Sequence, residues 1–281
     1  MTLGRMLVAT LVLIAACVLL KLLVTALEPS LVFYPMAGEV ENPSAEGINY
    51  HRLELSTTDG ERLVAWQLEP EDSSADVVYF HGNGGNLSVW LPVFAALTHA
   101  KLRVLAVDYR GYGGSTGRPS EQGLYRDAEA VVTYARRQRA SGASRPLVYW
   151  GRSLGGAVAA AAARFAPPDG VILESTFADK AAVIRRNPIL RALNLFSSYR
   201  FATVDALRDF SGPVLVMHGD RDSVIPFDLG RELFDRLDAP KRFAVIRGGD
   251  HNDAFPVSDR AYWEPVLEFV ASLSNTSSSP H

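Results

Sequence analysis

Apolar residues follow three patterns along the chain. Residues 6–27 form an apolar run that only Lys21 interrupts. Two segments with alternating apolar and polar positions come next, near 48–55 and 62–68, and a Thr-Asp-Gly turn separates them. Beyond this pair, short apolar runs alternate with longer segments of helical spacing. The patterns predict an apolar N-terminal helix, an antiparallel pair of strands, and then a series of alternating strands and helices.

The short apolar runs predict a parallel sheet. Parallel strands are buried on both faces, so their sequences read as continuous Val, Ile and Leu. A helix between successive strands is the connection that parallel pairing requires. We therefore expect an α/β fold with a mostly parallel central sheet, antiparallel entry strands and helices on both faces. The expected parallel strands are residues 77–80, 104–107, 147–150, 171–173, 214–217 and 243–246.

The chain of 281 residues is long for one domain, but α/β architectures of this size form one continuous core. The alternation is interrupted at 177–210, where arginines stand among apolar residues, and we expect a small helical cap there. Residues rich in Pro, Gly and Glu precede the first strand, and a Ser-rich tail ends the chain. The expected units are a helix at 1–27, a connector at 28–47, a domain at 48–273 and a disordered tail at 274–281.

The apolar run at 6–27 is about as long as a helix needs to cross the hydrocarbon core of a bilayer. Lys21 lies near its end and can place its ammonium group among the headgroups. We interpret the run as an uncleaved signal anchor that attaches the protein to a membrane. The alternatives are a cleaved signal peptide with a site at 24–26 and a lipoprotein signal that ends at Cys17.

The charges beside the apolar run indicate its orientation. Arg5 precedes the run, whereas Glu28, Glu39 and Glu41 follow it. Basic residues tend to remain on the cytoplasmic side of a membrane. We therefore expect the domain on the non-cytoplasmic side, which is periplasmic or extracellular.

Composition excludes several classes of protein. A net charge of −3 does not indicate the basic surface of a nucleic-acid binder, so we expect no nucleic-acid partner. The only cysteine, Cys17, lies in the apolar run, which leaves the domain without a disulfide or a thiolate metal site. The histidines and carboxylates do not have the spacing of metal ligands. We expect neither a metal nor a cofactor.

A Gly-Arg-Ser-Leu-Gly pentapeptide at 151–155 follows an expected strand and opens an Ala-rich segment. A serine at such a strand-to-helix turn exposes its hydroxyl group, and flanking glycines avoid collisions there. The N-terminus of the following helix stabilises negative charge. We expect Ser153 to be a nucleophile. The alternative is a serine that only caps the helix.

A serine attacks efficiently when a base accepts its proton and an acid orients that base. Asp222 and His251 follow later expected strands, at the sheet edge where α/β folds build their sites. Asp220, two residues before Asp222, and Glu174, at the end of another strand, are rival acids that we rank lower. Their alternative role is to accept hydrogen bonds from loop backbone.

Together these motifs resemble α/β hydrolases of the BEM46 or ABHD13-like group, over residues 30–272. The resemblance implies a membrane-anchored hydrolase in which Asp222 is the acid and His251 is the base. Residues 108–115, Asp-Tyr-Arg-Gly-Tyr-Gly-Gly-Ser, resemble a further family signature, which we interpret as a structural loop.

The same resemblance implies an oxyanion hole, a pair of N–H donors for the charge that develops during acyl transfer. Leu154, directly after the nucleophile, would supply one N–H group. Residues 81–86 resemble the His-Gly-x loop of the family, which makes Asn83 the expected second donor and Gly84 the alternative. We expect His81 to be a structural histidine beneath this loop.

We therefore expect a serine hydrolase of the carboxylesterase or lipase type that cleaves an ester or thioester through an acyl-enzyme. An apolar acyl pocket in the cap, and cap arginines that face anionic headgroups, would favour a small-molecule or lipid-like substrate. The alternative is that the cap only packs on the sheet with its arginines in solvent. An aminopeptidase or amidase, or an inactive membrane-tethered binding protein, are the other candidate functions. The expected pocket residues are Ile184, Ile189, Leu190, Leu193 and Phe196.

Overall fold

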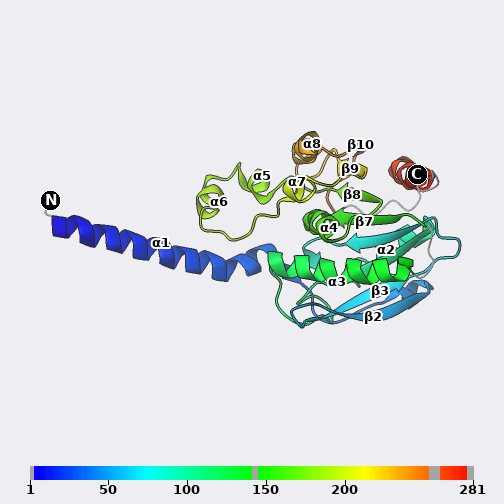
Figure 1. Ribbon diagram of the computed structural model, residues 1–281, viewed down its shortest axis with the longest axis horizontal. Coiled ribbons are helices and arrows are strands. Elements are labelled where there is room, and N and C mark those ends of the chain that lie inside the picture. Colours follow the sequence, from blue (N-terminus) through cyan, green and yellow to red (C-terminus); the bar gives the residue numbers. More distant parts are fainter. Residues whose placement is uncertain (1–2, 141–144, 253–259, 277–281) are drawn as a thin grey trace.

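The computed structural model describes residues 3–140, 145–252 and 260–276, and within them an eight-stranded sheet forms the centre of the molecule. The strand order is β10-β9-β8-β7-β4-β6-β3-β2. Figure 1 shows helices on both sides of this sheet and the single helix α1 extending away from it. The expected α/β fold is confirmed.

The strands begin and end close to the predicted positions. β2 and β3 form the antiparallel entry, β3 is also antiparallel to β6, and the remaining neighbours are parallel. The strands of the large sheet are β2 (Tyr50–Ser56), β3 (Arg62–Leu68), β4 (Ala75–Phe80), β6 (Leu102–Val107), β7 (Leu147–Arg152), β8 (Gly170–Glu174), β9 (Val214–Gly219) and β10 (Lys241–Ile246). A separate parallel pair joins β1 (Tyr34–Pro35) to β5 (Gly84–Gly85).

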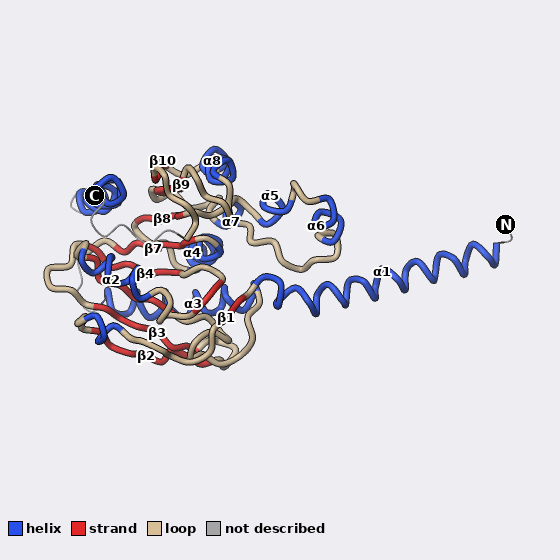
Figure 2. Tube along the Cα trace, turned by 180° about the vertical axis from the view of Figure 1, so that it is seen from behind, coloured by secondary structure: helices blue, strands red, loops and turns tan. Residues whose placement is uncertain are grey.

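Helices cover both faces of the sheet: α3 and α4 pack together on one face, and α2 and α9 pack on the other (Figure 2). The Ala-rich α4 is buried along most of its length, because small side chains let it lie close to β7. The amphipathic α3 buries one apolar stripe and exposes its charges. The helices of the domain are η1 (Pro43–Glu46), α2 (Leu91–His99), α3 (Glu121–Ala140), α4 (Leu154–Phe165), α5 (Lys180–Ile184), α6 (Pro188–Leu193), α7 (Thr203–Ala206), α8 (Phe227–Arg236) and α9 (Arg260–Thr276).

The N-terminal helix is longer than the apolar run. α1 extends over Leu3–Val32, and its apolar stretch is long enough to span a membrane. Its last five residues belong to the segment that we expected to be a connector. The chain then continues directly into β1, which pairs with the loop after β4. The end of the apolar helix is therefore attached to the domain by backbone hydrogen bonds.

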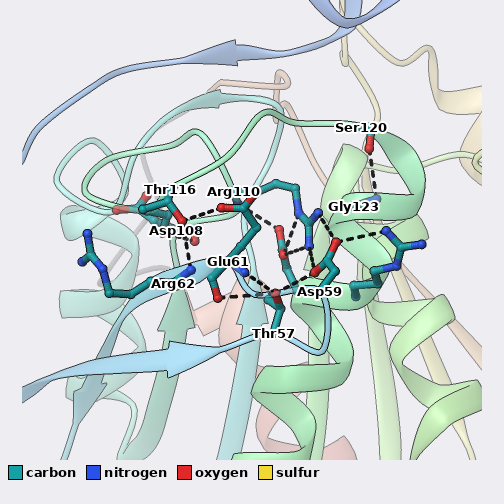
Figure 3. A network of polar contacts seen from close by, with 12 residues as sticks. Thr57, Asp59, Glu61, Arg62, Asp108, Arg110, Thr116, Ser120 and Gly123 are labelled. Atoms are coloured by element: carbon teal, nitrogen blue, oxygen red, sulfur yellow. Dashed lines mark hydrogen bonds and ion pairs between the residues drawn. The ribbon is translucent and has the colours of Figure 1, made fainter.

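The loop at 108–115 has a structural role through a buried ion-pair network (Figure 3). Arg110 is buried, and its guanidinium group binds Asp59 at 2.8 Å and Asp127 at 2.8 Å. Hydrogen bonds from Arg110 and Thr57 hold the pKa of Asp59 well below its usual range. The network joins the β2–β3 turn, the loop after β6 and helix α3.

We predict that Arg110→Ala lowers the free energy of unfolding by about 3–5 kcal/mol, because it leaves the fully buried carboxylate of Asp127 without a cation. Arg126→Ala is the matched control, since Arg126 is half-exposed and binds only the outer carboxylate, Asp59. Its expected cost is below about 1 kcal/mol. Denaturant titration of both variants measures the difference. Equal losses in the two variants would contradict the prediction.

Candidate active site

Ser153 stands in a strained turn between β7 and α4. Its backbone has a φ of 54° and a ψ of −123°, a conformation that residues with side chains rarely adopt. Hydrogen bonds hold the turn: the Ser153 N–H donates to Glu174 O at 2.9 Å, and Thr176 Oγ1 donates to Ser153 O at 2.6 Å. The neighbouring strand β8 and the residues directly after it therefore compensate the strain.

The glycines around Ser153 are required by close backbone contacts. A Cβ atom at Gly155 would collide with the carbonyl oxygens of Phe80 and His81, and one at Gly151 would collide with the backbone of α4. A Cβ atom at Gly82 would stand 3.5 Å from the Cβ atom of Ser153. The loop after β4 thus lies directly against the serine.

The structure brings together the three residues that the sequence analysis singled out from distant strands. His251 Nε2 lies 3.0 Å from Ser153 Oγ, and His251 Nδ1 lies 2.8 Å from Asp222 Oδ2. In the neutral tautomer with the proton on Nδ1, His251 donates to Asp222 and accepts from the serine hydroxyl. This arrangement can move a proton away from Ser153.

Asp222 is buried and accepts several hydrogen bonds. Burial acts to raise its pKa, but hydrogen bonds from His218, His251 and the Ile225 N–H hold that pKa well below its usual range. The Ile225 N–H donates to Asp222 Oδ1 at 2.7 Å. His218 Nε2 lies 2.8 Å from Ile225 O and 3.4 Å from Asp222 Oδ2. Asp222 is therefore a fixed, ionised partner for His251.

The two rival acids have other partners. Asp220 accepts a hydrogen bond from the Gly248 N–H at 2.6 Å, which is the backbone role that we named as its alternative. Glu174 is buried and accepts from Trp150 Nε1 at 2.9 Å and from the Tyr262 hydroxyl at 3.2 Å. Of the three carboxylates, Asp222 is the one that contacts the His251 ring.

Arg152 is a positioning residue that the sequence analysis missed. Its guanidinium group is buried, lies over the Trp90 ring at 5.5 Å from the ring centroid, and donates to His251 O at 2.6 Å. It thereby fixes the backbone of the loop that carries the imidazole. Its place between Gly151 and Ser153 was visible, but the contact joins residues 99 positions apart, which no local pattern reveals.

Leu154 and Asn83, the two candidate oxyanion donors, both line the cleft beside Ser153, as does the alternative Gly84. The backbone hydrogen bonds of the described residues leave the Asn83 N–H unused. The side-chain amide of Asn83 donates to Val32 O at 2.9 Å, and its backbone carbonyl accepts from the Tyr34 N–H at 3.0 Å. The end of α1 and strand β1 therefore hold this loop in place.

His81 lies beneath the same loop, as expected. It is buried, and burial lowers its pKa to about 4, so its imidazole is neutral near pH 7. Its ring packs on that of Tyr109, with a centroid separation of 4.3 Å, and its Nδ1 lies 2.7 Å from Gly82 O. These contacts give it a structural role.

Ser153 and His251 lie in a cleft of about 580 Å³ with mostly apolar walls. The last turn of α1 contributes Leu31 and Val32 to the wall, and the cap contributes Val183 and Ile184. The described residues contain no cluster of three His, Cys, Asp or Glu side chains that could hold a metal ion. The cleft is thus a largely apolar cavity beside a serine hydroxyl.

The cap differs from the expectation in its pocket residues. Of the five expected, Ile184 lines the cleft, whereas Ile189, Leu190 and Leu193 are exposed on α6 and Phe196 is half-buried. Two of the cap arginines, Arg185 and Arg186, are exposed and form ion pairs with Glu232 and Asp228 of α8. Those carboxylates were too distant in the sequence to anticipate.

Comparison with known proteins supports the same family assignment. A family model described as the alpha/beta hydrolase fold matches residues 77–202. The protein MT2364 of Mycobacterium tuberculosis is 34% identical over 244 residues, covering 85% of this chain and 86% of that protein. The membrane protein YNL320W of Saccharomyces cerevisiae is 32% identical over 240 residues, covering 83% and 84%.

A solved structure has the same fold. The esterase Pf2001 of Pyrococcus furiosus superposes with a TM-score of 0.69 at 19% identity, covering 86% of this chain and 97% of that one. The relatives, the family model and this fold agree with the resemblance found in the sequence. The chain belongs to the α/β-hydrolase superfamily and is consistent with its ABHD13-like membrane-anchored group.

Proposed function

We propose that this protein is a serine hydrolase that cleaves carboxylic esters or thioesters through an acyl-enzyme. The observation that carries the proposal is the continuous chain of hydrogen bonds from Asp222 through His251 to Ser153. The fold supports hydrolase activity in general, and the solved structures of similar fold include esterases. The roles of the individual residues are inferred from their geometry.

In the first half of the reaction, His251 Nε2 accepts the hydroxyl proton as Ser153 Oγ bonds to the carbonyl carbon of the substrate. The carbonyl oxygen becomes an oxyanion, which the N–H groups of Leu154 and Asn83 stabilise. Asp222 stabilises the imidazolium that forms. Collapse of this intermediate breaks the bond to the alcohol or thiol, which takes the proton from His251 and leaves an acyl group on Ser153.

In the second half, His251 accepts a proton from water while the water oxygen bonds to the acyl carbon. The second tetrahedral intermediate uses the same oxyanion donors. It releases the carboxylic acid, and Ser153 Oγ recovers its proton from His251. The reaction so written uses these three side chains, the two backbone N–H groups and water.

The N-terminal helix and the name of the yeast relative support attachment to a membrane. We propose that α1 is an uncleaved signal anchor, because its apolar stretch is long enough to span a membrane and its end is packed into the domain as part of the cleft wall. The charges around it favour the non-cytoplasmic side for the domain. The apolar cleft favours an ester with an acyl chain, so a lipid-like substrate is part of the proposal.

A fluorophosphonate probe should label the full-length protein covalently, and Ser153→Ala should abolish the labelling. The probe reacts with a serine only where a base activates the hydroxyl, which is the property proposed for Ser153. Gel fluorescence of the purified protein in detergent measures the result. Ser56→Ala is a control that should keep the labelling, because Ser56 is an exposed serine at the end of β2, outside the cleft. Labelling that persists in Ser153→Ala would refute the assignment.

Substitution of the candidate acids by asparagine should show which of them orients His251. Asp222→Asn is expected to lower kcat for a chromogenic ester by about 10³–10⁴-fold, because an amide cannot stabilise the imidazolium and favours the wrong tautomer of His251. Asp220→Asn is the matched control. Its kcat should stay within about threefold of that of the unchanged protein, because the substitution alters a hydrogen bond to loop backbone. A larger loss in Asp220→Asn would reverse the assignment.

Hydrolysis of p-nitrophenyl esters of increasing chain length tests the nature of the acyl group. We expect kcat/KM to rise from acetate to octanoate, because each buried methylene contributes about 0.8 kcal/mol in an apolar cleft. Ile184→Asp places a carboxylate in the cleft wall. It should lower kcat/KM for the octanoate ester more than kcat/KM for the acetate ester. A steep preference for acetate would exclude the lipid-like substrate.

A further inference from the structure

Helix α6 presents apolar side chains to the exterior of the domain. All six of its residues are exposed, among them Ile189, which is 70% exposed, and Leu190. Leu195, two residues beyond its end, is 82% exposed. Isolated apolar side chains on a surface are ordinary, but such a cluster on one projecting segment indicates contact with an apolar partner.

A second group of exposed apolar side chains surrounds the mouth of the cleft. Leu31, Tyr34, Val89 and Val224 all line the cleft and are all more than half exposed. They come from α1, β1, the loop before α2 and the loop after β9. The path into the cleft is therefore apolar from its rim inward.

The cleft lies very near the apolar part of α1. Leu31 and Val32 belong to the cleft wall, and Leu31 follows the end of the apolar run at Leu27 by four residues. At about 1.5 Å per residue, this separation is about 6 Å along the helix. The headgroup layer of each leaflet is about 5–8 Å thick. In a bilayer that α1 spans, the cleft opens within the headgroup layer.

The end of α1 is fixed to the domain by specific contacts. Glu28 is buried and accepts hydrogen bonds from Lys180 Nζ at 3.0 Å and from the Ser198 N–H at 3.1 Å. Phe33, directly after the helix, packs edge-on against Tyr199, with a centroid separation of 5.7 Å. These contacts restrict how the domain can turn relative to the helix.

This attachment places α6 on the membrane side of the domain. In both Figure 1 and Figure 2, α6 lies at the end of the domain from which α1 extends, and it projects in the direction of the N-terminus. In this position, α6 reaches the same headgroup layer as the rim of the cleft. Arg185 and Arg186, on the segment before α6, are paired with carboxylates of α8, whereas Arg191 is exposed on α6 itself. The surface therefore combines apolar side chains with an arginine, a composition that suits the membrane interface.

We propose that α6 and the apolar rim of the cleft dock on the bilayer that α1 spans, and that the substrate passes from this layer into the cleft. The docking follows from the exposed apolar side chains and the position of α1. The entry of a substrate rests on the proposed hydrolase function. The occupant of this surface is the lipid layer itself, because the cleft wall is continuous with the spanning helix.

A fluorescent label tests the docking without reference to activity. The full chain with Cys17→Ser and L195C carries the dye NBD and is inserted into phosphatidylcholine vesicles that contain headgroup-level spin-labelled lipid. The matched control is E71C, because Glu71 is exposed in the loop before β4, at the end of that strand opposite the cleft. We expect blue-shifted emission and quenching by the lipid for L195C, and neither for E71C.

Two results would overturn the docking. The first is a label at position 195 that aqueous iodide quenches as strongly as the label at position 71, which would place α6 in water. The second is a blue shift that disappears as the protein is diluted in lipid, because that would assign the surface to a second copy of the chain.

Substrate entry is tested with the I189D/L195D variant of the full chain in the same vesicles. Hydrolysis of a fluorogenic long-chain ester dissolved in the bilayer should fall by about tenfold or more, because charges on α6 oppose its burial in the interface. Hydrolysis of soluble p-nitrophenyl butyrate should stay within about twofold. The matched control is V245D/L267D, which adds two carboxylates at exposed apolar positions of β10 and α9.

The outcomes separate the two proposals. If the unchanged protein hydrolyses neither ester, the hydrolase function fails, while the label still decides the docking. If it hydrolyses both and I189D/L195D affects the two esters equally, substrate entry from the bilayer is wrong. A selective loss for the bilayer ester, absent from V245D/L267D, supports it.

Discussion

The site depends on the close approach of three backbone segments: the end of β4, the turn at Ser153 and the first turn of α4. Gly155 lies so near the carbonyl groups of Phe80 and His81 that a side chain there would force the segments apart. This contact holds the loop that contains Asn83 against the turn that carries Ser153. The unusual φ of Ser153 is a consequence, and the hydrogen bonds from β8 make it tolerable.

The rest of the candidate site is held by hydrogen bonds from neighbouring residues. Asp222 is fixed by backbone N–H groups and by His218, while His251 is fixed by Arg152 through its carbonyl group. Such support sets the distances from Asp222 to His251 and from His251 to Ser153 before any substrate arrives. Preorganisation of this kind lowers the barrier without a rearrangement at the moment of reaction.

Much of the fold could be predicted because it depends on local patterns. Continuous apolar runs gave the parallel strands, and glycines around Ser153 marked the turn. The contacts that could not be predicted join distant segments. The ion pairs of the cap arginines with α8, and the Arg152 bond to His251, depend on how the chain folds back on itself. The continuation of α1 past Leu27 was hidden by Pro29, which usually indicates the end of a helix but here lies inside one.

The direct junction between α1 and the domain limits how this protein can be separated from its membrane. The segment at 28–36 supplies the partner of Lys180, three residues of the cleft wall and the strand that pairs with the loop after Asn83. A protease that sheds the domain by cutting within this segment would therefore open its pocket at the same time. Release into solution and an intact pocket are compatible only when the cut falls before Glu28.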